Sequence, residues 1–179
     1  MLKVTTTRFG DVEVSEDDVI QLPGGLIGFP ELKRFVLFDH DKKDSPFKWL
    51  QSLDDGAIAF VLINPLLFKA DYTVEVAEAE VVDLDLSSEE DAVISVIITL
   101  PSDPKNMTAN LKAPLVFNLK NRRGRQIILN SSKYTTRHNI LEEVNQQAAE
   151  ADSAAIKEAI ERVKDSQLVE NEKIAEGEE

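Results

Sequence analysis

The segment from Thr108 to Leu129 constrains the fold of this chain more than any other stretch. Its first half alternates apolar and more polar residues, which is the period of a β-strand with one buried face. The apolar positions of this half are Leu111, Ala113, Leu115, Phe117 and Leu119. A polar loop at 121–124 follows, where we expect Gly124 to supply the positive φ of a tight turn. Because the alternation resumes over 125–129, the segment predicts a β-hairpin.

Short segments with strand character fill the chain before this hairpin. We predict strands at 2–6, 12–14, 19–22, 35–39, 47–53, 57–63, 72–76, 82–86 and 92–100. Residues 57–63 are apolar at every position, as expected of a strand buried on both faces. One alternative stays open, because the acidic segment 75–86 could be partly helical instead. Many short strands at close intervals, without a recurring long helix, predict an all-β sandwich or barrel.

The pattern changes after Leu141. Apolar residues then recur at steps of three and four, which predicts a helix of about twenty residues with an alanine-rich apolar side. Beyond Gln167 the acidic sequence is predicted to be disordered. All eleven aromatic residues lie at or before Tyr134, so we expect the core to end near there. The chain is therefore divided into a compact β-barrel-like domain at 1–141 and an acidic, helical, partly disordered tail at 142–179.

The charge of the chain bears on its partners. It carries 33 acidic and 20 basic residues, a net charge of −13, of which the tail contributes −8 with twelve acids and four bases. Such an average field repels phosphate, so direct nucleic-acid binding is disfavoured and a basic protein partner is favoured. The alternative interpretation is that the acidic residues serve only to keep the protein soluble and do not attract a partner. The basic cluster Lys120, Arg122, Arg123 and Arg125 fits a solvated turn better than an RNA-contacting loop, which would need aromatic side chains beside it.

Catalytic and metal-binding chemistry leave no local signature in this sequence. Without cysteine there are no disulfides, thiol nucleophiles or cysteine-ligated metals. Asp83 and Asp85 fit a solvated face better than a metal site. No phosphate-binding loop or nucleophile elbow is present, although a triad assembled in space would show no such motif. We therefore expect no cofactor, no metal and no enzymatic activity.

The sequence also predicts where the protein resides. No apolar run reaches the roughly eighteen residues that a membrane-spanning helix needs. The N-terminal residues MLKVTTTRFG lack the long apolar stretch of a secretory signal. We therefore predict a cytoplasmic protein without membrane attachment.

Several segments, taken in order, resemble one known family. They are PGGLIGF at 23–29, PFKWLQS at 46–52, AFVLINP, LLF and ADY within 59–72, TANLKAPLVFN at 108–118, RRGRQIIL at 122–129 and YTTRH at 134–138. Together they resemble the FliW family of flagellar assembly factors over Leu2 to Leu141. The ordered set is specific, although no single motif is decisive. The tail lies beyond this resemblance.

The resemblance implies a β-barrel-like binding protein that is not an enzyme, and we expect it to be monomeric when free. It implies two protein partners, flagellin and the RNA-binding regulator CsrA. When it is bound to CsrA, a FliW-family protein antagonises the repression of flagellin translation. Flagellin competes with CsrA for the FliW-family protein, so function depends on the difference between the two affinities. The alternatives are a flagellin-binding chaperone without the regulatory arm, a small β-barrel RNA-binding protein, or an enzyme with an unrecognised carboxylate site.

Candidate partner contacts lie in or beside the central segments of the resemblance. They are Trp49, Gln51, Asn64, Phe68, Asp71, Tyr72 and Glu75. Exposed aromatic rings with neighbouring amides make good interface anchors, and the two acids would supply charge. Each residue also has a structural alternative, for example Trp49 in the core and Asn64 in a turn.

Two further hypotheses concern the end of the chain. Tyr134 and Arg137 are candidates for a structural latch that closes the barrel. The helical tail could occupy a partner groove of the same molecule, as a mimic of the helical flagellin terminus.

Overall fold

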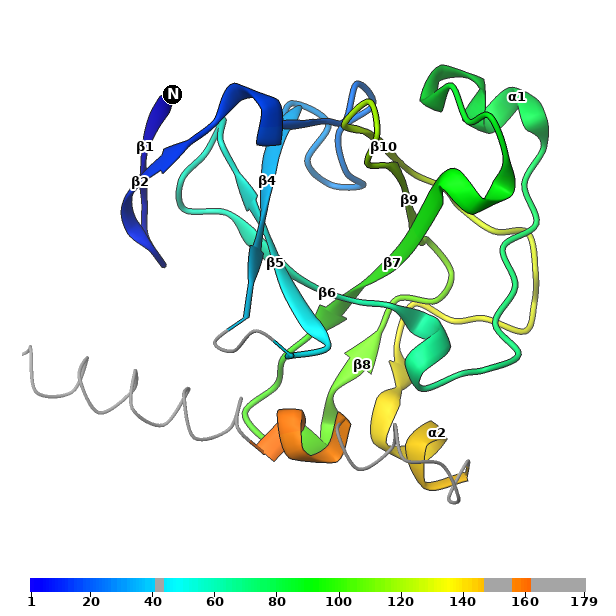
Figure 1. The fold of residues 1–179 in the computed structure, drawn as a ribbon. Helices are drawn as coiled ribbons and strands as arrows, with labels where there is room; N and C mark the ends of the chain where they lie inside the picture. Colours follow the sequence, from blue (N-terminus) through cyan, green and yellow to red (C-terminus); the bar gives the residue numbers. More distant parts are fainter. Residues whose placement is uncertain (41–43, 147–155, 162–179) are drawn as a thin grey trace, which may run out of the picture.

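The computed structural model describes residues 1–40, 44–146 and 156–161. Seven strands close a barrel (Figure 1): β3 (Ile20–Gln21), β4 (Arg34–Asp39), β5 (Phe47–Ser52), β6 (Ala59–Ile63), β7 (Ala92–Thr99), β9 (Leu115–Asn118) and β10 (Arg123–Gln126). They pair in the order β3–β4–β5–β6–β7–β9–β10, and a parallel pairing of β10 with β3 closes the ring. The other pairings in the ring are antiparallel. The all-β, barrel-like fold expected from the sequence is confirmed.

Shorter elements lie around the ring. The strands β1 (Leu2–Thr6) and β2 (Gly10–Val14) form a separate hairpin, and β8 (Thr108–Ala109) and β11 (His138–Asn139) extend the sheet beyond the end of β7. The α-helices among the described residues with assigned bounds are α1 (Glu78–Val81) and α2 (Ile140–Gln146). The helical turns are η1 (Glu16–Asp18), η2 (Pro65–Leu67), η3 (Val82–Leu84), η4 (Glu89–Asp91) and η5 (Pro104–Asn106).

Among the described residues, two of the three apolar clusters lie on opposite faces of the barrel wall, and the third packs the β1–β2 hairpin against β4. The interior cluster comprises Ile20, Leu22, Leu26, Leu32, Phe35, Leu50, Leu62, Leu115 and Phe117. The outer cluster joins alternate residues of β5, β6, β7 and β9 to residues 72–91, which we call the arch, and to the C-terminal helical segments. Strand β9 is consequently buried on both faces. Val116 and Asn118, which the alternation predicted to be tolerant of water, are 3% and 2% exposed because the arch covers them.

The predicted hairpin forms from β9 and β10, but its turn differs from the prediction. The turn spans residues 119–122, and Arg122 takes the positive φ, 57°, that we expected at Gly124. Gly124 lies inside β10, where a Cβ atom would stand 2.6 Å from the ring of Phe117. Its role is therefore to leave room for an interior side chain.

The predicted strands at 72–76 and 82–86 are wrong. Residues 73–77 have no regular structure, and residues 78–84 form α1 and η3, so the helical alternative is correct for the second part of the arch. At the start of α1 the Glu80 carboxylate accepts a hydrogen bond of 3.0 Å from the Ala77 N–H, which satisfies a free amide of the first turn. Asp85 has a left-handed φ of 50°, which interrupts any strand at that point.

The C-terminal helical prediction is tested only in part. Helix α2 begins at Ile140, and residues 156–161 are also helical. Ile156 and Ile160, at 1% and 3% exposure, pack in the outer cluster together with Val144. Residues 147–155 and the predicted disordered end after Gln167 lie outside the described residues, and the division at 141 stays a prediction.

The close approach of Gly124 to Phe117 gives a first prediction. The Gly124→Ala variant should lower the free energy of unfolding by about 1–3 kcal/mol, because the buried ring has no room to yield. Gly24→Ala is the matched control, since no atom lies within 4 Å of its Cβ position, and its stability should change by less than about 0.5 kcal/mol. Urea unfolding of both variants measures the difference. Equal stability of the two would show that the barrel interior is more loosely packed than the structure indicates.

Candidate functional site

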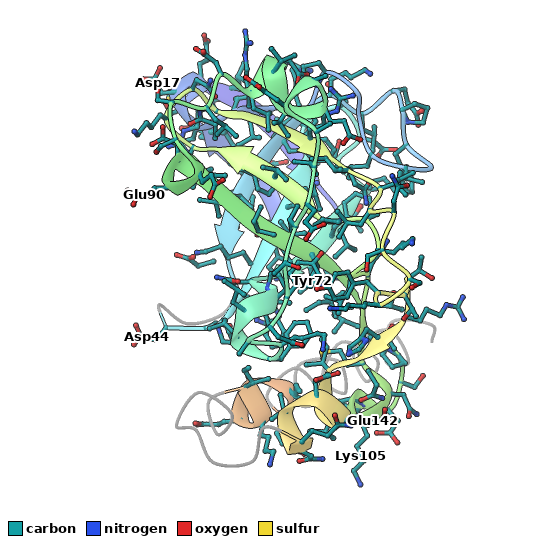
Figure 2. All side chains as sticks on the ribbon, turned by 90° about the vertical axis from the view of Figure 1, so that its right-hand side faces the viewer. Asp17, Asp44, Tyr72, Glu90, Lys105 and Glu142 are labelled. Atoms are coloured by element: carbon teal, nitrogen blue, oxygen red, sulfur yellow. The ribbon has the colours of Figure 1, made fainter. Side chains whose placement is uncertain are left out.

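A groove of about 880 Å³ lies between the arch and the barrel wall, on the side that faces the viewer in Figure 2. Its apolar lining consists of Pro65, Leu66, Tyr72, Val74, Val76, Val81, Val82, Leu86, Ala92, Ile94 and Val116. Two of these side chains, Leu66 and Val82, are 52% and 71% exposed. Exposed apolar side chains gathered in one groove are typical of a docking site for another molecule.

Acidic side chains accompany this apolar lining. Glu75, Glu78, Asp85 and Glu89 line the groove, are all exposed, and are called the acidic rim below. None of the lining residues is basic. Because no cation of the lining balances these carboxylates, the groove favours a positively charged ligand.

Two tyrosines anchor the first end of the arch. The Tyr72 hydroxyl donates a hydrogen bond of 2.8 Å to the Leu111 carbonyl, and the Tyr134 hydroxyl accepts one of 3.0 Å from the Thr73 N–H. The ring centroids of Tyr72 and Tyr134 are 4.6 Å apart. Burial, and to a lesser extent the neighbouring Tyr134, raises the pKa of Tyr72, so its hydroxyl stays protonated and can donate. Tyr134 therefore forms a latch, but it fastens the arch and not the barrel, which the pairing of β10 with β3 closes. Arg137, the other residue predicted for this latch, is exposed.

The tip of the β9–β10 hairpin anchors the second end. The Asn118 amide donates hydrogen bonds of 3.0 and 3.2 Å to the carbonyls of Leu84 and Asp85. The Asn121 amide donates a bond of 2.9 Å to the same Leu84 carbonyl. Since Asn118 is buried in β9, its position is set by the barrel, and the arch is held against the barrel in turn.

The basic cluster of the hairpin is engaged in ion pairs. Lys120 pairs with Asp91, Arg122 with Asp18 at 3.4 Å and Arg125 with Asp83 at 3.2 Å, while Arg123 donates to the Asp83 carbonyl at 3.0 Å. The hydrogen bond from Lys120 holds the pKa of Asp91 below its usual value. Each basic side chain of the cluster thus contacts an acidic residue, which gives the RNA-contacting hypothesis no support.

A partly buried cluster of charges joins the segment after η2 to helix α2. The Lys69 ammonium lies 3.1 Å from Asp71 and 3.5 Å from Glu143, and the Glu143 carboxylate lies 2.7 Å from Nε2 of His138. Burial alone would lower the pKa of Lys69, but the hydrogen bond to Asp71 and the attraction of Glu143 outweigh it and raise the pKa. Lys69 therefore stays charged and links the segment that precedes the arch to α2 through Glu143.

Metal-ligand clusters and membrane-spanning helices are both absent from the described residues. Within them, no three or more His, Asp or Glu side chains converge as metal ligands. No helix of the described part is long and apolar enough to cross a bilayer. The chemistry of the groove itself is apolar contact combined with carboxylate attraction.

Comparison with known proteins identifies the family. A family model described as FliW protein matches residues 3–140. The chain belongs to the FliW family of flagellar assembly factors. Among curated FliW-family relatives, the flagellar assembly factor FliW of Caldanaerobacter subterraneus subsp. tengcongensis is 44% identical over 143 residues, which cover 80% of this chain and 95% of the relative. That of Alkaliphilus metalliredigens is 42% identical over 139 residues, covering 78% and 86%.

A solved structure supports the same assignment. A crystal structure of the flagellar assembly factor FliW superposes with a TM-score of 0.72 at 35% sequence identity, and covers 78% of this chain and 96% of that chain. The family resemblance expected from the ordered motifs is thus confirmed, and so is the FliW-like fold.

In this FliW-family chain, the predicted contact residues fall into two groups. Tyr72 and Glu75 line the groove, and Asp71, whose pKa is lowered by its hydrogen bond to Lys69, lies beside it. Asn64 caps η2 by accepting a hydrogen bond of 3.0 Å from the Leu66 N–H.

The remaining predicted residues of this FliW-family chain are buried. Phe68 is completely buried, and Trp49 is 8% exposed, with the Arg8 guanidinium 4.1 Å from its ring centroid and His40 stacked on it. The Gln51 amide nitrogen lies within hydrogen-bonding distance of the carbonyls of Ser52, Gly56 and Ile58 and holds the β5–β6 loop. The groove does not include these three residues.

The sequence did not single out most of the groove lining. Leu66, Val81, Val82, Leu86, Ala92, Ile94 and Val116 were missed. The adjacent pair Val81 and Val82 within an acidic segment could have indicated part of the lining. If this segment is helical, as the alternative interpretation has it, such a pair lies on the surface. The residues of β7 and β9 carry no such signal, since a core strand has the same composition.

The anchoring of the arch gives a second prediction. Tyr72→Phe should lower the free energy of unfolding by about 1–2 kcal/mol at pH 7, because the buried Leu111 carbonyl loses its donor. Thr73→Val is the control, since it removes only a contact of 3.4 Å with the Tyr134 hydroxyl and should have a smaller effect.

The raised pKa of Tyr72 fixes the sign of the pH dependence. As pH rises, the unfolded chain releases the Tyr72 proton near pH 10, before the folded chain does. The contribution of this hydroxyl to the free energy of unfolding is therefore fully present below that pH and declines above it. The stability difference between the native protein and Tyr72→Phe should therefore shrink above about pH 10. A difference that grows in alkali would contradict the buried, protonated hydroxyl.

Proposed function

We propose that this chain binds flagellin and the translational regulator CsrA in the cytoplasm, and that the two partners exchange on it. In this proposal the complex with CsrA relieves repression of flagellin synthesis. Flagellin that accumulates before export displaces CsrA, which then silences the flagellin message. Function follows from a difference of affinities and requires no catalytic step.

The groove is the observation that carries the proposal. It combines exposed apolar side chains, Leu66 and Val82, with a rim of four carboxylates and no basic lining residue. These are the properties of a surface that recognises protein, since apolar contacts give affinity and charge gives partner selection. Tyr72 and Glu75, two of the predicted contact residues, contribute directly to it.

The charge of the chain supports CsrA as one of the partners. A protein that binds RNA presents basic surface, and a partner with a net charge of −13 attracts it and repels the RNA phosphates. A flagellin-binding chaperone without CsrA binding is the second candidate, because apolar contact with flagellin alone would also use the groove. Direct RNA binding is less favoured, since the hairpin cations are paired with acidic residues.

The deciding experiment is a calorimetric titration of the purified full chain, monomeric in our proposal, with CsrA of the same organism, repeated with flagellin already bound. We expect CsrA to bind and flagellin to suppress that binding. Binding of flagellin alone would leave the chaperone function, and binding of neither partner would refute the proposal.

A charge reversal in the acidic rim tests the place of binding. Glu75→Lys should weaken the binding of CsrA by about tenfold, because the carboxylate that attracts a basic partner becomes a repelling cation. Glu31→Lys makes the same change of net charge at an exposed position outside the groove lining, and should change affinity by less than about twofold. Equal effects of the two variants would mean that only the overall charge matters.

A further inference from the structure

One edge of β7 is open inside the groove. The Ile97 carbonyl accepts a hydrogen bond of 2.9 Å from Asn110 beyond β8, so odd-numbered residues of β7 direct their backbone groups toward β8 and β9. Since this direction alternates along a strand, the even-numbered residues face β6. Val96 and Ile98 accordingly pair with Ile63 and Val61 of β6.

The pairing with β6 stops before the first half of β7. Continued by two residues, the register would place Ile94 opposite Pro65. Proline has no N–H to donate, and the Pro65 carbonyl already accepts hydrogen bonds from Phe68 and Lys69. The chain turns into η2 at this point and leaves the sheet.

Three backbone groups of β7 therefore face the groove without a strand beside them. They are the carbonyl of Ala92 and the N–H and carbonyl of Ile94, and both residues line the groove. The Ala92 N–H is used, since it donates to the Glu89 carbonyl. An edge with free donors and acceptors is a template for pairing with another chain.

We propose that the groove takes up an extended segment of a partner protein, which adds a short strand to the open edge of β7 and carries apolar side chains flanked by basic ones. The inference rests on the proposed function in so far as the groove is the partner site. Backbone hydrogen bonds to Ile94 set the register of the added strand, and side chains give it specificity.

The lining of the groove defines the side chains of this occupant. Alternate side chains of an added strand point to one face of the sheet, where Val74, Val81 and Leu86 of the arch supply apolar contacts. The acidic rim belongs to the same arch, so the basic side chains that complement it lie at the ends of the added strand and flank its apolar residues. A second copy of this chain is a poor occupant, because two molecules of net charge −13 repel each other.

The test uses a defined probe, an acetylated heptapeptide of three valines flanked by two lysines on each side, added to the ¹⁵N-labelled full chain. At saturation the peptide should slow hydrogen exchange of the Ile94 amide by about tenfold or more, since a hydrogen-bonded strand amide exchanges only on opening. The matched control peptide has glutamate in place of each lysine and should bind far more weakly, because its carboxylates meet the acidic rim.

Two variants separate the backbone from the side chain. Ile94→Pro removes the N–H that faces the open edge and should abolish peptide binding, and the fold should be retained because proline is tolerated where no ladder bond is lost. Ile94→Ala keeps the N–H and should bind the peptide with affinity reduced only severalfold. If the proline variant fails to fold, the exchange measurement on the native chain decides.

Several results would overturn the inference. They are the absence of binding at millimolar peptide, binding that leaves exchange of Ile94 unchanged, as for a docked helix, and equal binding of the glutamate peptide. The titrations with CsrA and flagellin test the proposed function separately. If the peptide protects Ile94 but neither CsrA nor flagellin binds, strand addition is retained and the proposed function is refuted. If CsrA and flagellin bind but the peptide does not protect Ile94, the proposed function is retained and strand addition is refuted.

Discussion

The rest of the structure depends on the end of β6 at Asn64 and Pro65. Strand β7 is eight residues long, and its second half pairs with β6 while its first half pairs with β9. Because the Asn64 side chain caps η2 and Pro65 cannot continue the ladder, β6 stops short and the two strands diverge. The chain then travels outside the ring as the arch before it returns as β7. The groove is the space that this divergence leaves, so one proline and one cap position the proposed binding surface.

The arch that covers this space is held by side chains instead of a strand ladder. The hydroxyls of Tyr72 and Tyr134 fasten one end, and the Asn118 amide with the hairpin tip fastens the other. Asp83 and Asp91 are paired with hairpin cations in the process. The four carboxylates of the acidic rim line the groove instead. The acidic residues that anchor the arch are thus different from those that line the groove.

Sequence reasoning succeeded where the local pattern decides structure and failed where distant segments do. The strands that became β1, β4, β5, β6 and β7 were predicted, because β-branched and apolar runs bounded by turns define them. The hairpin was predicted but its glycine was misassigned, since the contact of Gly124 with Phe117 depends on how β10 faces the barrel interior. The strands predicted within the arch were wrong because the sequence around Val81 and Val82 fits a helix as well as it fits a strand. The double burial of β9 was missed because nothing local indicates that the arch covers it.

The sequence by itself determined the all-β class, the family, the acidic charge and the end of the strand predicted at 57–63, because each of these resides in composition or in neighbouring residues. Only the tertiary structure decided where the proposed docking groove lies. The groove draws its lining from η2, the arch, β7 and β9, which lie far apart in the chain. Exposure is likewise a property of the whole fold: Trp49 has the character of an interface anchor, yet Arg8 and His40 cover it, while Val82 is exposed to solvent. Solvent access depends on which distant segments pack together, and a local sequence pattern carries no record of that packing.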